Sequence, residues 1–298
     1  MKTKIIKKFF KYILMLFLVF FITFIVLSSY YLFIDRETKE PDEIQQICNI
    51  SIEKYQNRKI FIVKPKNTEN TDLTILYFHG GSYMAEATMN HWNFIQKLAI
   101  DTNSTVIMPD YPLSPKSDYT DVLSMVEPFY NELTKSTNTS NLIVMGDSAG
   151  GGLALGLMEK VSNSNGPIPL KIILISPWLD TRLNNPQIDE FQKKDSQLNR
   201  TNLQLAGRRY AGKNGTNSYL VNPIDGDISK LNNITIFIGT NDILNPDVHL
   251  LQKKALAENV LIDVKEYENA GHIWFIENNS SEDIVTKGYN DLLEVVNK

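Results

Sequence analysis

Short apolar runs alternate with amphipathic stretches along most of this chain. Short apolar runs bounded by polar residues are typical of buried strands, and apolar residues spaced three and four apart are typical of helices that pack on a sheet. The alternation predicts a mostly parallel central sheet with helices on both faces. The expected strands are 59–63, 73–78, 105–108, 142–144, 171–175, 234–238 and 262–267, and the expected helices are 89–101, 118–134, 153–160, 246–259 and 282–296.

One internal segment interrupts this alternation. Residues 181–222 are rich in Asn, Gln and Lys and contain no strand pattern. Helical spacing near 186–194 and 199–211 predicts a small helical cap inserted into the sheet domain. The predicted globular domain is therefore 58–298, with the cap between two of its strands.

The N-terminal part of the chain follows another pattern. Lysines recur in residues 1–11, and Tyr12–Ile34 then runs for 23 residues without a charge. About 20 apolar residues suffice for a helix to cross a bilayer, so we expect 12–34 to be an uncleaved transmembrane anchor. The alternative is a cleaved signal peptide and a secreted protein, although such signals have shorter apolar cores and small-residue cleavage sites. Residues 35–57 are polar with weakly helical spacing, and we expect a linker or cap segment with a short helix there.

Charge predicts the orientation of this anchor. Basic residues precede the apolar run and acidic residues follow it, which places the N-terminus inside and the globular domain outside. Tyr30 and Tyr31 fit the interfacial belt at the outer end of such a helix. The expected location is therefore the membrane, in a single pass, with the globular domain on the outer side.

Composition excludes several classes of function. The net charge of −4 gives no reason to expect nucleic acid as a partner. Cys48 is the single cysteine, so an intrachain disulfide and a cysteine-based metal site are excluded. The four histidines lack the spacing of metal ligands, and we expect neither a metal nor another cofactor.

A strand, a tight turn and a helix surround the most informative motif. An apolar strand leads into Gly146-Asp147-Ser148-Ala149-Gly150, and a helical pattern follows. This context is that of a nucleophile elbow, in which a strained turn presents the serine hydroxyl at the end of a strand. Gly146 and Gly150 fit positions where a Cβ has no room. The motif alone also occurs in ordinary Gly/Ser loops, so its partners decide the interpretation.

A second glycine-containing loop follows the strand 73–78. Adjacent Gly80 and Gly81, after His79, imply an unusual backbone path or a close approach to another group. We expect the loop's amides, together with the amide of Ala149, to bind the negative oxygen of a tetrahedral intermediate. An ordinary glycine turn is the alternative. His79 is expected to hold the loop by hydrogen bonds and not to act as a base.

A serine nucleophile needs a base, and that base needs a carboxylate. Asp242 and His272 follow the two strands after the cap, in the order serine, acid, histidine that α/β-hydrolases show. Asp247 is a rival acid, but at the start of a predicted helix it has a structural explanation. We expect His91 and His249, on predicted helices, to be surface residues.

Taken together, the motifs resemble the hormone-sensitive-lipase-type family of α/β-hydrolases, which includes bacterial carboxylesterases and acetyl esterases. The motifs that carry the resemblance are His79-Gly80-Gly81-Ser82, Asp110-Tyr111-Pro112-Leu113-Ser114-Pro115, Gly146-Asp147-Ser148-Ala149-Gly150-Gly151, Ser176-Pro177-Trp178-Leu179-Asp180, Gly239-Thr240-Asn241-Asp242-Ile243-Leu244 and Gly271-His272. The resemblance implies an α/β-hydrolase fold, a triad of Ser148, Asp242 and His272, and an oxyanion hole formed by the amides of Gly81, Ser82 and Ala149.

The chain departs from the family pattern at three positions. Ser82 replaces the third glycine of the first motif, and Pro112 and Lys116 replace an arginine and a glutamate. These changes leave the family resemblance intact, but they put substrate preference in doubt and alter ion pairing near the site. The membrane anchor also lies outside the family's usual soluble pattern.

The sequence leads to three hypotheses. The first is a membrane-anchored serine carboxylesterase that hydrolyses short-chain esters of small molecules through an acyl-enzyme. The second is an extracellular deacylase or acyltransferase that acts on cell-wall, lipid or peptide substrates. The third is a non-catalytic ligand-binding module, which usually lacks a triad residue; here all three are present. The natural ester and the oligomeric state stay open.

Overall fold

The computed structural model describes residues 12–23, 36–66 and 71–298. Residues 12–23 are helical, and their apolar side chains are exposed. No helix within these described ranges combines the length and the apolar character needed to cross a membrane. The expected basic N-terminus and the remainder of the expected anchor, 24–34, lie outside the described residues.

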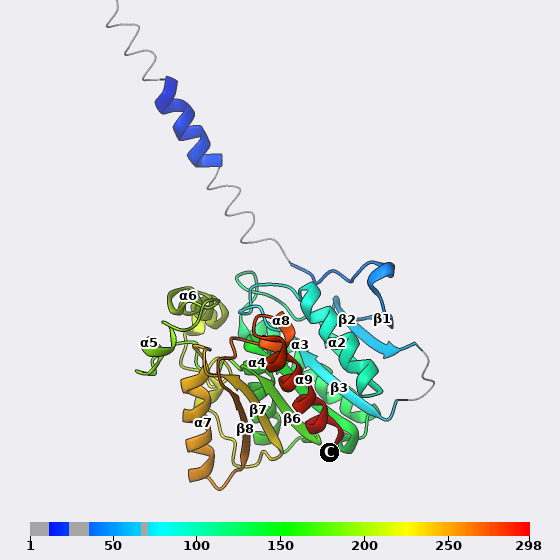
Figure 1. Cartoon of the computed structure of the whole chain (residues 1–298). Helices are drawn as coiled ribbons and strands as arrows, with labels where there is room; N and C mark the ends of the chain where they lie inside the picture. The colour runs from blue at the N-terminus through cyan, green and yellow to red at the C-terminus, as the bar shows by residue number, and fades with distance from the viewer. Residues whose placement is uncertain (1–11, 24–35, 67–70) are drawn as a thin grey trace, which may run out of the picture. The chain divides into compact units, whose positions relative to one another are not determined.

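Residues from Arg36 onward form one compact unit around an eight-stranded sheet. The strand order is β1-β2-β4-β3-β5-β6-β7-β8. Figure 1 shows β1 and β8 at opposite sides of the sheet. β1 and β2 pair antiparallel and β2 pairs antiparallel with β4, whereas all later neighbours are parallel. The strands are β1 (Cys48–Tyr55), β2 (Arg58–Pro65), β3 (Leu73–Phe78), β4 (Ser104–Pro109), β5 (Leu142–Asp147), β6 (Lys171–Ile175), β7 (Ile234–Gly239) and β8 (Ile262–Tyr267).

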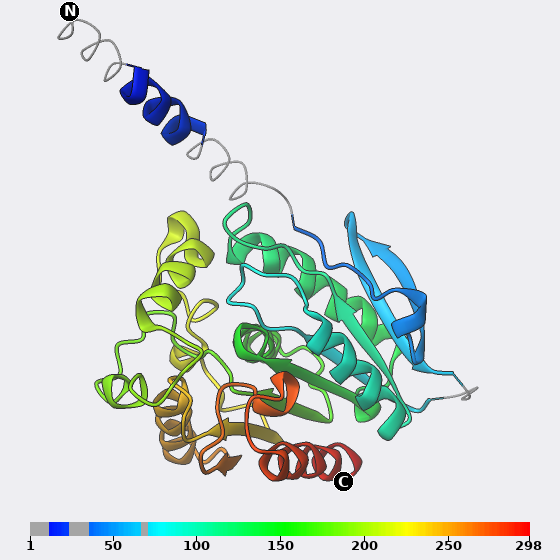
Figure 2. The ribbon, with the colours of Figure 1, turned by 45° about the horizontal axis from the view of Figure 1, so that its top comes forward.

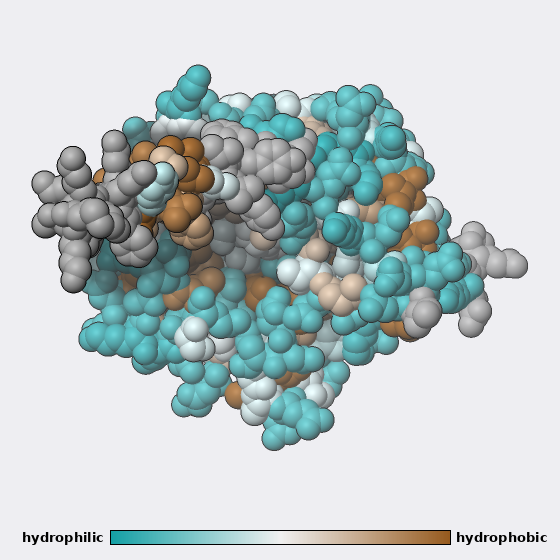
Figure 3. Space-filling model, turned by 90° about the horizontal axis from the view of Figure 1, so that it is seen from above, coloured by the Kyte–Doolittle hydropathy of each residue, from teal (hydrophilic) through white to brown (hydrophobic). Residues whose placement is uncertain are grey.

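Helices cover both faces of this sheet, as the alternation of patterns predicts. One apolar layer joins the sheet to α3, α4 and α7, and a second joins it to α2, α8 and α9. From above, the visible surface is mainly hydrophilic, with hydrophobic residues in separate patches (Figure 3). The helices are α2 (Met89–Asp101), α3 (Tyr119–Ser136), α4 (Ser148–Asn163), α5 (Ile188–Phe191), α6 (Arg200–Ala211), α7 (Asn245–Ala257), α8 (Trp274–Glu277) and α9 (Glu282–Asn297).

The segment between β6 and β7 is helical, as expected. It contains α5 and α6, and the expected pieces 186–194 and 199–211 enclose or match these helices. α5 packs beside α7 (Figures 1 and 2). Asn199 begins α6 by accepting hydrogen bonds from two amides of its first turn.

The expectation of a linker and short helix over 35–57 is wrong for most of that segment. A 3₁₀ turn forms only at Glu43–Gln45, and Cys48–Tyr55 is the edge strand β1. Isoleucines spaced three apart suggested a helix, but Cys48, Ile50 and Ile52 also alternate with the period of two that a strand requires. Burial raises the pKa of the Cys48 thiol to about 11, so this free cysteine stays protonated in the sheet.

Candidate active site

The nucleophile elbow joins β5 to α4, and its geometry depends on two glycines, Gly146 and Gly150, which have no side chain. Ser148 has φ of +50°, in the left-handed region that L residues adopt at a cost. A Cβ on Gly150 would lie 2.0 Å from the Phe78 carbonyl oxygen, and one on Gly146 would lie 2.3 Å from the Gly150 carbonyl oxygen. The two glycines therefore allow α4 to approach β3 closely, with Ser148 at the tip of the turn between β5 and α4.

Three predicted side chains meet in one hydrogen-bonded line. The Ser148 hydroxyl donates to His272 Nε2 over 2.9 Å, and His272 Nδ1 donates to Asp242 Oδ2 over 2.8 Å. All three residues are buried. The loops after β7 and β8 supply the acid and the histidine, so parallel neighbours bring residues far apart in sequence to one edge of the sheet.

The surroundings of His272 favour its protonated form. Burial disfavours the imidazolium, but the nearby carboxylates, Asp242 above all, together outweigh burial and raise the pKa of His272 above its ordinary value. Asp195 and Asp147 act in the same direction as Asp242. The ring can therefore accept the proton that Ser148 loses during attack.

The rival acid Asp247 is not a partner of the histidine. It lies buried in the first turn of α7, where its Oδ1 accepts a hydrogen bond from Asn185 over 3.0 Å. Burial raises the pKa of Asp247 to about 7. Asp247 therefore lies at the start of a helix and is hydrogen-bonded to the cap.

The predicted oxyanion loop follows β3 and has the unusual backbone its glycines imply. Gly81 has φ of +110°, and Ser82 and Tyr83 have φ of +55° and +59°. Within residues 71–298, no protein group accepts a hydrogen bond from the amides of Gly81, Ser82 or Ala149. Three amide donors beside a nucleophile are what an oxyanion hole requires.

Asp147, the residue before the nucleophile, ties this loop to the elbow. Its carboxylate accepts hydrogen bonds from the Gly80 amide over 3.0 Å and from the Tyr77 hydroxyl, and it lies 3.3 Å from His91 Nε2. Burial opposes its charge, but His91, together with the Tyr77 hydrogen bond, outweighs burial and lowers the pKa of Asp147. In turn, the Asp147 carboxylate outweighs burial and raises the pKa of His91.

The expectation that His91 lies on the surface is therefore wrong. Its helix α2 turns it inward, where only 3% of the residue is exposed. Helical position alone did not reveal which face meets the sheet, although the apolar residues Trp92 and Ile95 share the buried side with His91. His249 is half-exposed on α7, as expected, and pairs with Glu266 over 2.8 Å.

His79 lies in the loop without touching the triad. Its Nδ1 donates to the Gly80 carbonyl over 2.6 Å, and its ring stacks on Tyr111 with 4.6 Å between ring centres. The Tyr111 hydroxyl donates to the His79 carbonyl over 2.7 Å. Burial, and then His91, lower the pKa of His79 to about 4, so the ring is neutral near pH 7.

Asp110, the first residue of the motif Asp110-Tyr111-Pro112-Leu113-Ser114-Pro115, pairs with an arginine from another part of the chain. Asp110 pairs with Arg58 of β2, whose Nη2 lies 3.0 Å from Oδ2. Asp110 also accepts a hydrogen bond from the Thr38 amide over 2.9 Å. Arg58 lies on β2, whereas Pro112, at the family's arginine position, lies in the loop after β4.

The sequence patterns did not reveal two residues that hold the loops of His272 and Asp242. Ser176, with φ of +45°, accepts a hydrogen bond from the amide of Ile273, next to His272, over 3.1 Å. Asp195 of the cap accepts one from the amide of Ile243, next to Asp242, over 2.9 Å. Ser176 opens a recognised motif, which is a usable signal, whereas Asp195 follows two lysines and resembles a solvated surface residue.

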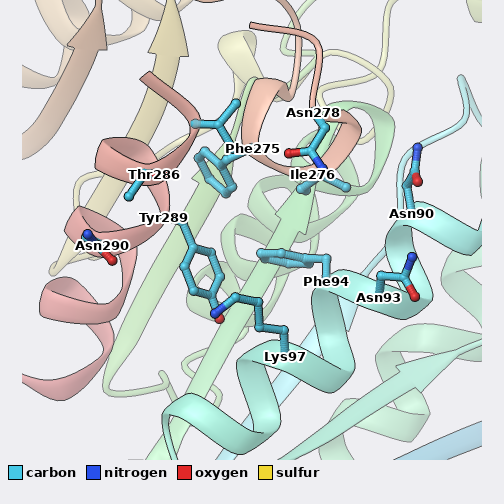
Figure 4. Close-up of a pocket in the computed structure, with 11 residues that line it drawn as sticks. Asn90, Asn93, Phe94, Lys97, Phe275, Ile276, Asn278, Thr286, Tyr289 and Asn290 are labelled. Atoms are coloured by element: carbon cyan, nitrogen blue, oxygen red, sulfur yellow. The ribbon is translucent and has the colours of Figure 1, made fainter. Parts of the chain in front are cut away.

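A separate cavity lies away from the triad. It has a volume of about 310 Å³ and opens between α2, α8 and α9 (Figure 4). Phe94, Phe275 and Tyr289 form apolar walls, and Lys97 Nζ lies 4.1 Å from the centre of the Tyr289 ring. These walls belong to the helical layer opposite α4, so this cavity is distinct from the surroundings of Ser148.

The fold and the site together define the class of the protein as a serine hydrolase acting on ester bonds. A parallel sheet presents an elbow serine, a histidine and an aspartate at its edge, with free amides beside them. The chain belongs to the α/β-hydrolase fold family, whose model matches residues 75–276.

Similar proteins agree with this assignment. The chain is 25% identical to an acetyl-hydrolase of Streptomyces hygroscopicus over 67% of this chain and 68% of the relative. It is 28% identical to an esterase of Acinetobacter venetianus over 65% of this chain and 64% of the relative. A hormone-sensitive lipase from a metagenome library shares the fold, with a TM-score of 0.78 and 21% identity, covering 87% of this chain and 86% of the other.

Proposed function

We propose that this protein is a membrane-anchored carboxylesterase that hydrolyses short-chain carboxylic esters with Ser148, His272 and Asp242. The observation that carries the proposal is the unbroken hydrogen-bonded line from the Ser148 hydroxyl through His272 to Asp242. Such a line lets the histidine act as a base while the carboxylate fixes its tautomer.

The reaction has two halves. The Ser148 oxygen attacks the ester carbonyl carbon while its proton passes to His272 Nε2, and the amides of Gly81, Ser82 and Ala149 stabilise the carbonyl oxygen's negative charge. His272 then gives the proton to the leaving alcohol, which leaves an acyl group on Ser148. Water repeats the sequence, so the acid is released and the serine hydroxyl is restored.

The proposal of short acyl chains rests on the surroundings of the site. Tyr83 directly follows the oxyanion loop and stacks on Tyr210 of α6, with 3.5 Å between ring centres, and on Trp178. All three rings are buried, so aromatic side chains occupy space beside the nucleophile helix. The name of the Streptomyces relative, an acetyl-hydrolase, agrees with a small acyl group.

A serine substitution tests the proposed chemistry. We expect Ser148→Ala to lower kcat for p-nitrophenyl acetate by a factor of roughly 10⁴ or more, because the nucleophile is lost. Ser140→Ala, which changes an exposed serine before β5, is the matched control and should leave kcat unchanged. Equal turnover by the Ser148→Ala variant and the wild type would contradict the triad.

The proposed location rests on the N-terminal sequence. The uncharged run Tyr12–Ile34, with lysines before it and acidic residues after it, supports an anchor with the catalytic domain outside. The exposed apolar side chains of 12–23 also need an apolar partner. Retention of the full chain in membranes after alkaline extraction, and its cleavage by protease added to intact cells, are the expected results; release by alkali would contradict the anchor.

The same location favours a second candidate substrate class. A surface-tethered esterase meets cell-wall polymers, lipids and secreted peptides, so deacylation or acyl transfer on these is the alternative. This alternative would be favoured if, at equal enzyme concentration, acetate release from isolated cell wall exceeds release from simple esters.

A further inference from the structure

The cap contributes a buried carboxylate that reaches the loop of the catalytic acid. Asp195 lies between α5 and α6 and is only 9% exposed. Its Oδ1 accepts hydrogen bonds from the amides of Gln197 and Leu198, each over 2.8 Å. Its Oδ2 accepts one from the amide of Ile243, over 2.9 Å. One carboxylate therefore shapes the cap turn 195–198 and joins it to the loop after β7.

The Ile243 amide belongs to the turn that orients Asp242. In that turn, Asp242 Oδ1 accepts a hydrogen bond from the Leu244 amide over 2.9 Å, which leaves Oδ2 for His272. The two successive amides after the catalytic acid are thus held by two carboxylates, its own and that of Asp195. A shift of the Ile243 amide would rotate the carboxylate that His272 needs.

The same cap turn also lies beside the histidine loop. A Cβ placed on Gly271 would lie 3.3 Å from Gln197 Oε1, so the cap turn lies against the residue before His272. Gln192 braces the turn from within the cap, because its side chain accepts from the Arg200 amide over 2.7 Å and donates to the Leu198 carbonyl over 2.9 Å.

We infer that Asp195 is a positioning residue for the catalytic acid, supplied by the cap. It holds the turn that orients Asp242 and places a second negative charge near His272. This inference rests on the proposed function of the triad. The cap is then part of the catalytic machinery as well as a cover for the site.

The charge of Asp195 has a consequence for pH dependence. The anions that act on His272 are Asp242, Asp195 and Asp147, and each raises the pKa of the ring. The neutral ring is the base, so kcat/KM rises with pH through that pKa. Removing the Asp195 charge lowers the pKa of His272, and the acid limb of the profile should move to lower pH.

Asp195→Asn in the full chain separates positioning from folding. The asparagine carbonyl can still accept from Gln197 and Leu198, but its NH₂ group then faces the Ile243 amide, so that hydrogen bond and the charge are both lost. We expect kcat to fall about 10- to 100-fold with little change in KM, and the acid limb to move to lower pH. A wild-type kcat with an unmoved acid limb would overturn the inference.

Two further variants complete the test. Asp195→Glu keeps the charge but displaces the turn, so kcat should fall while the acid limb of the pH profile stays in place. A wild-type kcat for Asp195→Glu would overturn the positioning role, even if Asp195→Asn does not fold. Asp189→Asn removes another cap carboxylate, whose side chain is 75% exposed, and should change neither quantity. If the wild type neither cleaves p-nitrophenyl acetate nor reacts with a fluorophosphonate at Ser148, the proposed function itself fails, and this inference with it.

Discussion

At the scale of single residues, the site depends on two buried carboxylates, each of which lies against a buried histidine. Asp242 lies against His272, and Asp147 lies against a second histidine, His91. The second pair does not touch the reacting atoms. It fixes the Gly80 amide and thereby the path of the oxyanion loop.

Asp147→Asn tests the contribution of this pair to stability. Breaking a buried pair by removing one partner costs about 3 to 5 kcal/mol. The pKa of His91 is raised, so its contribution is complete below about pH 6.5, its ordinary pKa, and disappears as pH rises through the raised value. The pKa of Asp147 is lowered, so its contribution is complete above about pH 4 and disappears as pH falls through the lowered value.

The difference in unfolding free energy between the wild type and Asp147→Asn should therefore be largest near pH 5. Urea unfolding followed by tryptophan fluorescence at several pH values measures it. Asp263→Asn removes an exposed carboxylate near Lys265 and should change stability by less than about 1 kcal/mol at any pH. Equal stability of the wild type and the Asp147→Asn protein at pH 5 would show that the pair contributes nothing.

At the scale of helices and strands, apolar runs predicted every parallel strand and each long helix of the domain. The strand β1 was missed because it is an edge strand with mostly exposed residues, so burial imposes little pattern on it. The four-residue helix α8 was missed because it starts after Ile273, whose φ of +42° no sequence pattern reveals. The triad followed from strand order, whereas His91 and Asp195 depend on tertiary contacts between distant segments.

The contact between α4 and β3 gives a prediction at this scale. A Cβ on Gly150 would collide with the backbone oxygens of Phe78 and His79, at 2.0 and 2.5 Å, so Gly150→Ala must separate the helix from the strand. We expect a loss of about 1 to 3 kcal/mol in unfolding free energy and a lower kcat, because the same backbone leads into the oxyanion loop.

A glycine later in the same helix is the matched control. At Gly156 the nearest atoms to an added Cβ are 3.8 Å away, so Gly156→Ala should stabilise the protein by about 0.5 to 1 kcal/mol through helix propensity. Thermal unfolding of both variants measures the contrast. Equal melting temperatures for the two variants would contradict the role of the close approach.

At the scale of the whole molecule, residues from Arg36 onward form one unit that contains every element of the site. The segment before β2 belongs to this unit: Trp92 donates to the Lys39 carbonyl over 2.8 Å, and β1 pairs with β2 along its length. The domain therefore begins earlier than the expected boundary at residue 58.

Two truncated chains test this boundary. The chain 36–298 should fold and cleave p-nitrophenyl acetate with the kcat/KM of the full chain, because it keeps every contact of the site. The chain 58–298 lacks β1 and exposes the buried edge of β2, so it should aggregate or melt at a lower temperature. Activity and melting temperature are measured for both chains. Equal values for the two truncated chains would show that β1 is dispensable.

The place of β8 in the sheet also bears on protein synthesis. The nucleophile elbow is complete once β5 and α4 have been translated, but the base follows β8, the last strand to leave the ribosome and an edge strand of the sheet. A nascent chain thus carries a serine without its base until the final strand pairs with β7. With the proposed triad, hydrolytic activity should appear only after translation has passed His272, and a chain interrupted before that residue should be inactive.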